Sequence, residues 1–170
     1  MQAARELGHA LAARNLGLVY GGAKVGVMGA LAQAVLERGG KVIGVIPRML
    51  MTTEVANLEL ADLRLVASMH ERKALMAELA DGFIALPGGF GTLDELFEAV
   101  TWAQLGLHHK PCGLLNVHRY YDRLLDFLHH ISAEHFIKAE HHDMVLVDDD
   151  CEALLEKFVR YKPRYVGKWR

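Results

Sequence analysis

Two glycine-rich segments contain the residues whose types and spacing best suit ligand binding. The first, LVYGGAKVGVMG, includes Gly22, and the second is IALPGGFGTLDE. In each segment an apolar, strand-like run ends, glycines follow, and a pattern of helical period begins. Glycines allow close backbone approach, and the free N–H groups and the dipole of a helix start attract an anion. Both segments are therefore predicted to be phosphate-binding turns.

Neither segment has the spacing of the common nucleotide motifs. A P-loop requires GxxxxGK[ST] and a dinucleotide turn requires GxGxxG, so neither ATP hydrolysis nor dinucleotide binding is indicated. Two such turns on one parallel sheet can both open at the carboxyl ends of its strands, where ligands bind in this class. In the first segment, close helix–strand packing explains Gly26 and Gly29 equally well.

Arg72, in the run MHERK, is the candidate cation. It shares a helical stripe with Met69, Met76 and Leu79, which places it at the border of a buried face. A guanidinium binds phosphate or ribose oxygens through two parallel hydrogen bonds, which suits a ligand contact. A solvated surface turn is the alternative for an isolated ERK triplet. Lys73 and Lys24 are weaker phosphate candidates.

Glu95 is the candidate carboxylate, because it follows Thr92 by three residues and would project from the start of the same helix. A fixed carboxylate beside a bound ligand activates a water as a general base or stabilises positive charge that develops in a transition state. The alternative is a capping box, with Thr92 as N-cap and Glu95 reaching back to its amide. Glu98, one turn further on, either assists or is a solvated helix charge.

Histidines and cysteines do not indicate a metal site. The adjacent pairs among the ten histidines, such as His108 and His109, cannot face one site together on a helix, so surface histidines are expected. Cys112 and Cys151 lie far apart and in no metal-binding spacing, which favours reduced cytosolic thiols. We therefore expect neither a metal nor a cofactor.

Bulk properties favour one globular domain over residues 1–170. The chain is 52% hydrophobic and 24% charged with a net charge of -2, which argues against disorder and against nucleic-acid binding. The first residues lack the apolar core of an export signal, and no run is long enough to span a membrane. A cytoplasmic location is expected.

Short apolar runs alternate with segments of helical period, which is typical of βαβ units. Strands are predicted at 18–20, 42–46, 63–66, 82–86, 113–116 and 144–147. Helices are predicted at 2–14, 26–38, 70–80, 92–105, 121–131 and 152–161. Residues 47–62 are expected to form a loop that crosses the strand ends. The fold class is α/β: a Rossmann-like, doubly wound parallel sheet with helices on both faces.

The motif PGGFGTLDE, in company with MHERK and TWAQLGLHHKPCGLLN, resembles the Lonely Guy family of cytokinin riboside 5′-monophosphate phosphoribohydrolases. The similarity covers residues 18–47, 69–73, 86–98 and 101–116, and extends less specifically to about residue 155. Proteins of this family begin with a strand and a serine- and glycine-containing loop that help to bind the nucleotide. This sequence opens on a helix, so we expect it to lack that first strand.

The resemblance implies a Rossmann-like homodimer that cleaves the bond between adenine N9 and ribose C1′ of nucleoside 5′-monophosphates such as AMP. The products are the free base, a cytokinin or adenine, and ribose 5-phosphate, and neither metal nor cofactor takes part. Arg72 and Glu95 are the implied catalytic pair. The candidate substrate-binding residues are Gly22, Met69, Lys73, Pro87, Gly88, Gly89, Gly91, Thr92 and Glu98. Members of this family are often labelled lysine decarboxylases, yet the sequence shows no specific site for a pyridoxal Schiff base.

Two other functions stay open at the level of sequence. The same turns could serve a nucleotide-binding or sensing module without turnover, or a truncated, dimeric scaffold. The presence of both Arg72 and Glu95 favours the enzyme, because a pure phosphate binder gains nothing from a carboxylate close to an anion.

Overall fold

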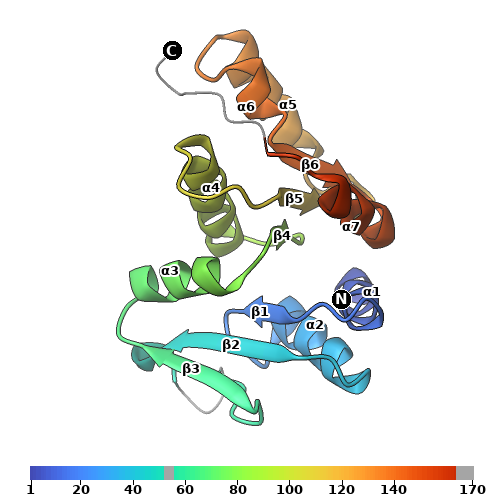
Figure 1. The fold of residues 1–170 in the computed structure, drawn as a ribbon, viewed down its shortest axis with the longest axis vertical. Coiled ribbons are helices and arrows are strands. Elements are labelled where there is room, and N and C mark those ends of the chain that lie inside the picture. The colour runs from blue at the N-terminus through green and yellow to red at the C-terminus, as the bar shows by residue number, and fades with distance from the viewer. Residues whose placement is uncertain (52–55, 164–170) are drawn as a thin grey trace. The chain divides into compact units, whose positions relative to one another are not determined.

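The computed structural model describes residues 1–51 and 56–163, and these residues form two compact units (Figure 1). Unit 1 is Met1–Ala80 and unit 2 is Asp81–Arg170. Each unit contains its own three-stranded parallel sheet, so each is described by itself. The single domain expected over residues 1–170 stays a prediction.

Unit 1 alternates strands and helices around the sheet order β1-β2-β3. Leu18 pairs with Val42 and Ile43 pairs with Asp62 in parallel register. Its elements are α1 (Gln2–Ala13), β1 (Leu18–Tyr20), α2 (Gly26–Glu37), β2 (Val42–Pro47), the 3-10 helix η1 (Arg48–Leu50), β3 (Asp62–Val66) and α3 (Met69–Leu79). Helix α2 contacts β1 and β2, and α3 contacts all three strands.

A close contact between α1 and α2 fills much of the core of unit 1. A Cβ added at Gly8 of α1 would lie 2.7 Å from the Cβ of Ala34 on α2, so only glycine allows this approach. Leu7 and Val35 are fully buried beside it. On the sheet itself, Val45 and Ile46 of β2 are buried as well. The central strand is therefore covered, as the continuous apolar run 42–46 predicts.

The loop between β2 and β3 returns to the first glycine turn. The backbone N–H of Asn57 donates to the carbonyl of Gly22 at 2.8 Å, and Ala56 forms an antiparallel bridge with Ala23. The side-chain amide of Asn57 also donates to the hydroxyl of Tyr20, at 3.4 Å. The loop thus lies over the end of β1, as expected for residues 47–62. The two threonines of this loop, Thr52 and Thr53, lie outside the described residues.

Unit 2 has the sheet order β4-β5-β6, again parallel, with Phe83 paired to Cys112 and Cys112 paired to Val145. Its elements are β4 (Phe83–Ala85), α4 (Phe90–Gln104), β5 (Cys112–Leu115), the 3-10 helix η2 (Val117–Arg119), α5 (Asp122–Ala133), α6 (Ala139–His142), β6 (Val145–Asp148) and α7 (Cys151–Arg160). Helix α4 contacts β4 and β5, while α7 contacts β5 and β6.

Two apolar clusters hold unit 2 together. Ala85, Leu96, Leu114 and Tyr121 form a buried cluster between β4, α4, β5 and the start of α5. In the second cluster, the ring of Phe158 from α7 lies against glycines of the sheet. A Cβ added at Gly113 would lie 2.7 Å from the Phe158 ring. The first cluster fixes α4 against the sheet, and α4 is the helix that begins in the second glycine turn.

The α/β class and all six predicted strands are confirmed, and all six predicted helices are present with ends shifted by one or two residues. The short elements η1, η2 and α6 were not predicted, because a single turn has too few residues to show a period. The expectation of surface histidines is wrong for His141, which is 6% exposed and lies 3.0 Å from the amide nitrogen of Gln104. It is also wrong for His108, which is half-buried against Phe83.

His108 fastens the end of α4. One ring nitrogen, Nε2, lies 2.9 Å from the carbonyl of Ala99, and the other accepts from the N–H of Lys110 at 3.1 Å. Burial lowers the pKa of His108, which favours the neutral ring that this pairing requires.

Among the described residues, no helix is both long and apolar enough to cross a bilayer.

Candidate functional site

The second glycine turn connects β4 to α4. Helix α4 begins at Phe90, Gly89 is its N-cap, and the first intrahelical bond runs from the N–H of Leu93 to the carbonyl of Gly89 at 3.1 Å. The four preceding N–H groups, those of Gly89, Phe90, Gly91 and Thr92, have no acceptor within the helix by its geometry. Gly89 has no side chain and so makes no side-chain hydrogen bond to cap this end of α4. These amides are the natural partners of an anion.

The three glycines of this turn differ in what requires them. A Cβ at Gly88 would lie 2.2 Å from the hydroxyl oxygen of Thr92, so packing alone requires a glycine there. A Cβ at Gly89 or at Gly91 would meet no atom of the described residues within 4 Å. Packing therefore does not explain these two glycines, and the open space beside them is available to a ligand. Pro87, which precedes them, is half-buried.

The capping-box alternative for Glu95 is wrong. Because α4 starts two residues earlier than predicted, Thr92 is the third residue of the helix rather than its N-cap. Glu95 then lies one turn inside the helix and is half-buried. A carboxylate in that position cannot complete a box with Thr92, so local capping does not account for it.

One face of α4 carries a wide, open hollow of about 680 Å³. Its lining residues are Phe90, Leu93, Asp94, Phe97, Glu98, Thr101 and Trp102. Among the described residues, Phe90 is the most exposed large apolar side chain, at 93%. Glu98 is thus half-buried along an apolar hollow and is not a plain solvated charge.

Arg72, in unit 1, is buried against the first glycine turn. It is 9% exposed and is the one buried residue of α3. A Cβ at Gly21 would lie 2.2 Å from its Nη2 and 2.9 Å from its Cζ, so the guanidinium lies directly on the backbone of Gly21. Its Nη1 is 3.8 Å from the sulfur of Met69. The surface-turn alternative for MHERK is therefore wrong.

The residues of the MHERK motif have different roles at the start of α3. Ser68 is the N-cap, and its hydroxyl accepts from the N–H of Glu71 at 3.1 Å. The carboxylate of Glu71 accepts from the N–H of Ala67 at 2.8 Å. Glu71 is thus used at the start of the helix, while Arg72 turns inward. Lys73 is half-buried and Met69 is more exposed.

Local structure accounts for the other glycines of the first turn. Gly22 has a positive φ of 73°, and a Cβ there would lie 3.2 Å from Ile46 and Leu63. A Cβ at Gly29 would lie 2.1 Å from the carbonyl of Lys24. Packing is therefore the right explanation for Gly29. It is wrong for Gly26, where a Cβ would meet no described atom within 4 Å and a φ of 65° favours glycine instead. Contact of Gly22 with a substrate stays a prediction.

The structure thus gathers Gly21, Met69 and Arg72 in unit 1, and it gathers Gly88, Thr92 and the start of α4 in unit 2. Sequence reasoning missed two residues that touch the second turn. The hydroxyl of Tyr120 donates to the carbonyl of Gly88 at 2.8 Å, and that of Tyr121 donates to the carbonyl of Leu86. They lie more than thirty residues from the loop, so no local pattern connects them.

Among the described residues, no group of three or more histidine, cysteine, aspartate or glutamate side chains is arranged to hold a metal ion. Cys112 and Cys151 are free thiols, and burial raises the pKa of Cys112 to about 12. At neutral pH Cys112 is therefore an inert, protonated thiol.

Solved structures share the fold. A molybdenum cofactor binding protein from the phototrophic bacterium Rippkaea orientalis superposes with a TM-score of 0.71 at 23% identity, over 94% of this chain and 85% of its own. The molybdenum cofactor carrier protein of Chlamydomonas reinhardtii gives 0.68 at 22% identity, over 94% and 88%. At this identity the likeness concerns the fold alone.

Sequence comparison is more specific. A family model described as "Possible lysine decarboxylase" matches residues 28–158. A rice protein, "Probable cytokinin riboside 5′-monophosphate phosphoribohydrolase" (Oryza sativa subsp. japonica), is 50% identical over 96% of this chain and 65% of its own length. A cytokinin riboside 5′-monophosphate phosphoribohydrolase of Arabidopsis thaliana is 48% identical over 96% and 76%.

The chain thus spans about two thirds to three quarters of these relatives, and nearly all of it takes part in the match. The chain belongs to the family of cytokinin riboside 5′-monophosphate phosphoribohydrolases.

Proposed function

We propose that this chain hydrolyses the N-glycosidic bond of adenosine 5′-monophosphates, including N6-substituted ones, and releases the free base and ribose 5-phosphate. The observation that carries the proposal is the start of α4: an uncapped helix end beside Gly89 and Gly91, with the half-buried Glu95 one turn further on. The names of the relatives, which specify this reaction for those proteins, support the same activity here.

The 5′-phosphate is the group that this helix start would bind. Its negative charge complements the N–H groups of Gly89, Phe90, Gly91 and Thr92 and the positive end of the helix dipole. The hydroxyl of Thr92 is a further donor, and the open space at Gly89 and Gly91 lets the phosphate approach the backbone. Bound in this way, the phosphate fixes one end of the nucleotide.

Glu95 would act at the other end of the ribose. One helical turn rises about 5.4 Å, so Glu95 and the phosphate-binding amides are separated by roughly the length of a ribose. As the bond to N9 breaks, C1′ and the ring oxygen gain positive charge, which a fixed carboxylate stabilises. The oxygen of a water then bonds to C1′, and its proton leaves toward the carboxylate or the departing base.

Arg72 would supply a fixed cation to the same reaction. Its guanidinium is held by Gly21, so it loses little conformational freedom when it binds an oxyanion. Arg72 is also the one buried residue of α3, so its guanidinium is fixed by the fold and does not swing in solvent. We therefore keep Arg72 and Glu95 as the catalytic pair, and Gly22, Met69, Lys73, Pro87 and Glu98 as substrate-binding candidates.

Glu95→Gln tests the chemical role. We expect kcat for AMP to fall about a hundredfold or more, because the amide keeps the shape of the side chain but loses its charge. AMP binding, measured by calorimetry, should stay within about tenfold. Glu134→Gln, an exposed change at the end of α5, is the matched control. Wild-type protein that binds AMP without releasing base would point to a binding module instead.

Gly91→Ala tests the phosphate role of the turn. The added methyl meets no described atom within 4 Å and alanine favours a helix, so the free energy of unfolding should stay level or rise by up to about 1 kcal/mol. Affinity for AMP should nevertheless fall about tenfold or more, because the methyl occupies the space beside the amides. Gly17→Ala, whose nearest neighbour would be 3.7 Å away, is the control. Unchanged AMP affinity would contradict a phosphate at this helix start.

Gly21→Ala tests whether the position of Arg72 matters. The methyl would overlap the guanidinium, which is the flexible end of a side chain and can move away at a small cost in stability. We expect kcat/KM for AMP to fall nearly as far as in Arg72→Ala. The double variant should be no worse than Arg72→Ala alone, since Gly21 acts through Arg72. Additive losses in this cycle would show that Gly21 has a separate role.

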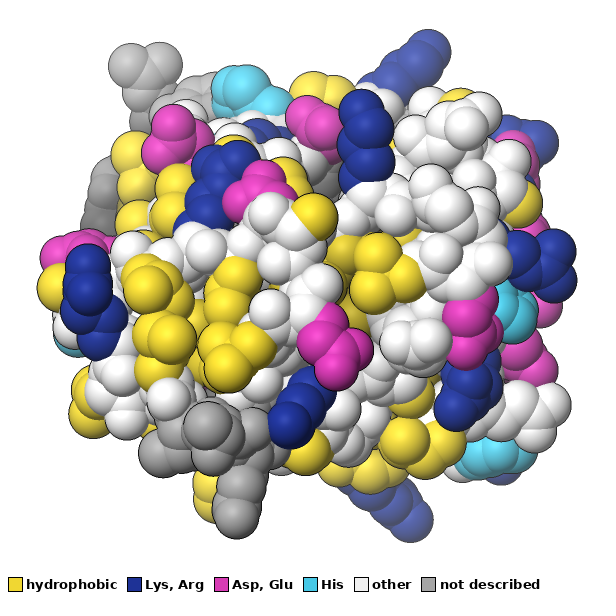
Figure 2. All heavy atoms as spheres, turned by 90° about the horizontal axis from the view of Figure 1, so that it is seen from below, with side chains coloured by type: hydrophobic (Ala, Val, Ile, Leu, Met, Phe, Trp, Pro, Cys, Tyr) yellow, Lys and Arg dark blue, Asp and Glu magenta, His cyan; other side chains and the backbone are white. Residues whose placement is uncertain are grey.

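We also propose a homodimer. Four exposed large apolar side chains lie on α4 and just after it, at Phe90, Phe97, Leu105 and Leu107. Further apolar patches, separated by charged side chains, are visible on the face shown in Figure 2. Exposed apolar surface of this kind marks interfaces, and a second copy of the chain is the simplest partner.

The two free thiols agree with the cytoplasmic location expected from the sequence.

Light scattering tests the dimer, which should have twice the mass of the 18.9 kDa chain. Phe97→Asp should give the single-chain mass, because it puts a charge into the apolar hollow of α4. Val159→Asp is the matched control, since Val159 is exposed on α7, which packs on β5 and β6. A single-chain mass for the unmodified protein would overturn the dimer.

A further inference from the structure

Tyr120 and Tyr121 hold the glycine turn at the start of α4 through hydrogen bonds to its backbone carbonyls. The hydroxyl of Tyr120 donates to the carbonyl of Gly88 at 2.8 Å. The hydroxyl of Tyr121 donates to the carbonyl of Leu86, on the other side of Pro87. Two adjacent residues thus fix two nearby carbonyl groups of the predicted phosphate-binding loop.

The two tyrosines reach the loop in different ways. Tyr121 is 2% exposed and belongs to the core cluster with Ala85, Leu96 and Leu114, whereas Tyr120 is 55% exposed. Their rings meet edge to face, with centroids 4.9 Å apart at 87°. Burial raises the pKa of Tyr121 to about 12, so its hydroxyl keeps its proton and remains a donor at neutral pH.

The turn that precedes the tyrosines, residues 116–119, has a strained backbone and is fixed by side-chain hydrogen bonds. His118 and Arg119 both have positive φ values, 52° and 61°, which side-chain-bearing residues rarely adopt. Asn116 compensates: its carbonyl oxygen Oδ1 accepts from the N–H of Tyr121 at 2.7 Å, and its amide nitrogen Nδ2 donates to Asp122 at 2.9 Å. Arg119 also donates to Asp122, at 2.6 Å. Such a turn holds the tyrosines in one place.

Peptide geometry connects these hydrogen bonds to the ligand side of the loop. In a trans peptide the C=O and the N–H point in opposite directions. The carbonyl of Gly88 shares its peptide with the N–H of Gly89, so Tyr120 directs that N–H away from itself. A bond between two glycines is the easiest in the loop to flip, because neither residue has a Cβ to restrict it. Tyr120 removes this freedom before any ligand arrives.

We infer that Tyr120 and Tyr121 are positioning residues of the phosphate loop: Tyr121 fixes its first carbonyl, and Tyr120 locks the Gly88–Gly89 peptide with its amide turned toward the ligand. The inference rests on the proposed function, since it assigns the 5′-phosphate as the group that this amide binds. Neither tyrosine takes part in bond cleavage.

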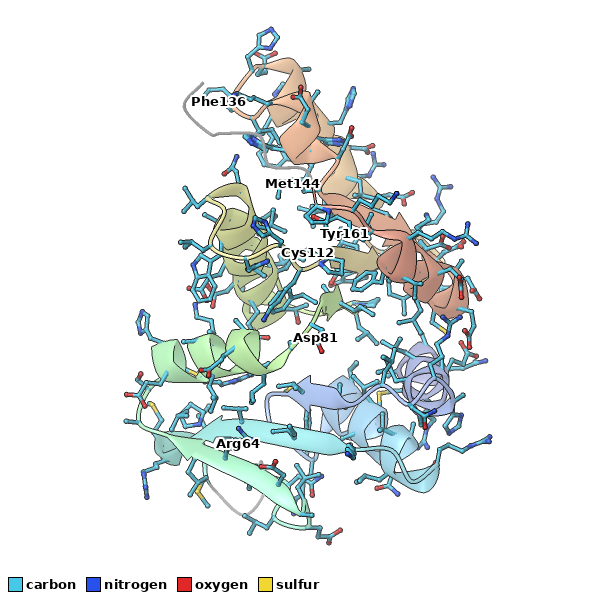
Figure 3. The ribbon with its side chains drawn as sticks, in the orientation of Figure 1. Arg64, Asp81, Cys112, Phe136, Met144 and Tyr161 are labelled. Carbon is cyan, nitrogen blue, oxygen red and sulfur yellow. The ribbon has the colours of Figure 1, made fainter. Side chains whose placement is uncertain are left out.

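The test is steady-state hydrolysis of AMP by Tyr120→Phe and Tyr121→Phe, which lose only a hydroxyl. For each we expect KM to rise about three- to tenfold, the effect of one neutral hydrogen bond, with kcat within about twofold. Inhibition by ribose 5-phosphate should weaken by the same factor, whereas inhibition by adenine, which has no phosphate, should not change. Tyr161→Phe, which follows α7 and is labelled in Figure 3, is the matched control and should behave as wild type.

Each other result has a defined meaning. A merely structural role would lower the melting temperature and the active fraction, and so kcat, without changing KM or the ribose 5-phosphate constant; that pattern would overturn the inference. Should Tyr121→Phe fold poorly, Tyr120→Phe decides the matter, because Tyr120 is half exposed. Wild-type protein that binds neither AMP nor ribose 5-phosphate would overturn the proposed function and this inference together. Wild-type activity with an unchanged KM in Tyr120→Phe would overturn the inference alone.

Discussion

The free amides at the start of α4 are the constraint on which the rest of unit 2 depends. A helix usually satisfies such groups with a serine, threonine, asparagine or aspartate at the N-cap, which stabilises it by about 1 kcal/mol. Here the N-cap is Gly89, which has no side chain to act as the acceptor. Helix α3 shows the ordinary solution, with Ser68 and Glu71. The contrast between the two helices indicates that α4 forgoes a cap in order to bind something else.

The distribution of glycines separates packing from binding. Gly29 and Gly88 are required by atoms of the protein that lie within 2.2 Å of the Cβ each would otherwise carry. Gly89 and Gly91 have no such neighbour. Gly91, inside the first turn of α4, is less favourable for the helix than alanine and fills no tight contact, which favours a use outside the folded chain itself. Gly21 is a third case, because the group it makes room for is the guanidinium of Arg72.

The sequence predicts the elements well and the contacts of the site less well. Strands were found because buried parallel strands are short apolar runs between glycines, and β1 matches its predicted range at both ends. The predicted start of α4 is two residues late, because Thr92 and Glu95 form a good capping pattern, whereas the helix takes Gly89 as its N-cap. Tyr120 and Tyr121 were missed because their partners lie in another element.

Burial of Arg72 was only partly predictable, for a similar reason. The helical stripe places it at the border of the apolar face, yet its depth depends on Gly21, which is distant in sequence and has no side chain to signal a contact. The same holds for the loop of Gly88, which Tyr120 fastens from beyond β5. In each unit, then, a long polar side chain from a distant part of the sequence contacts the backbone of a glycine turn: Arg72 at Gly21 and Tyr120 at Gly88. A pattern of residue types indicates where a ligand could bind, but only the fold shows which side chains make that place rigid enough to bind it.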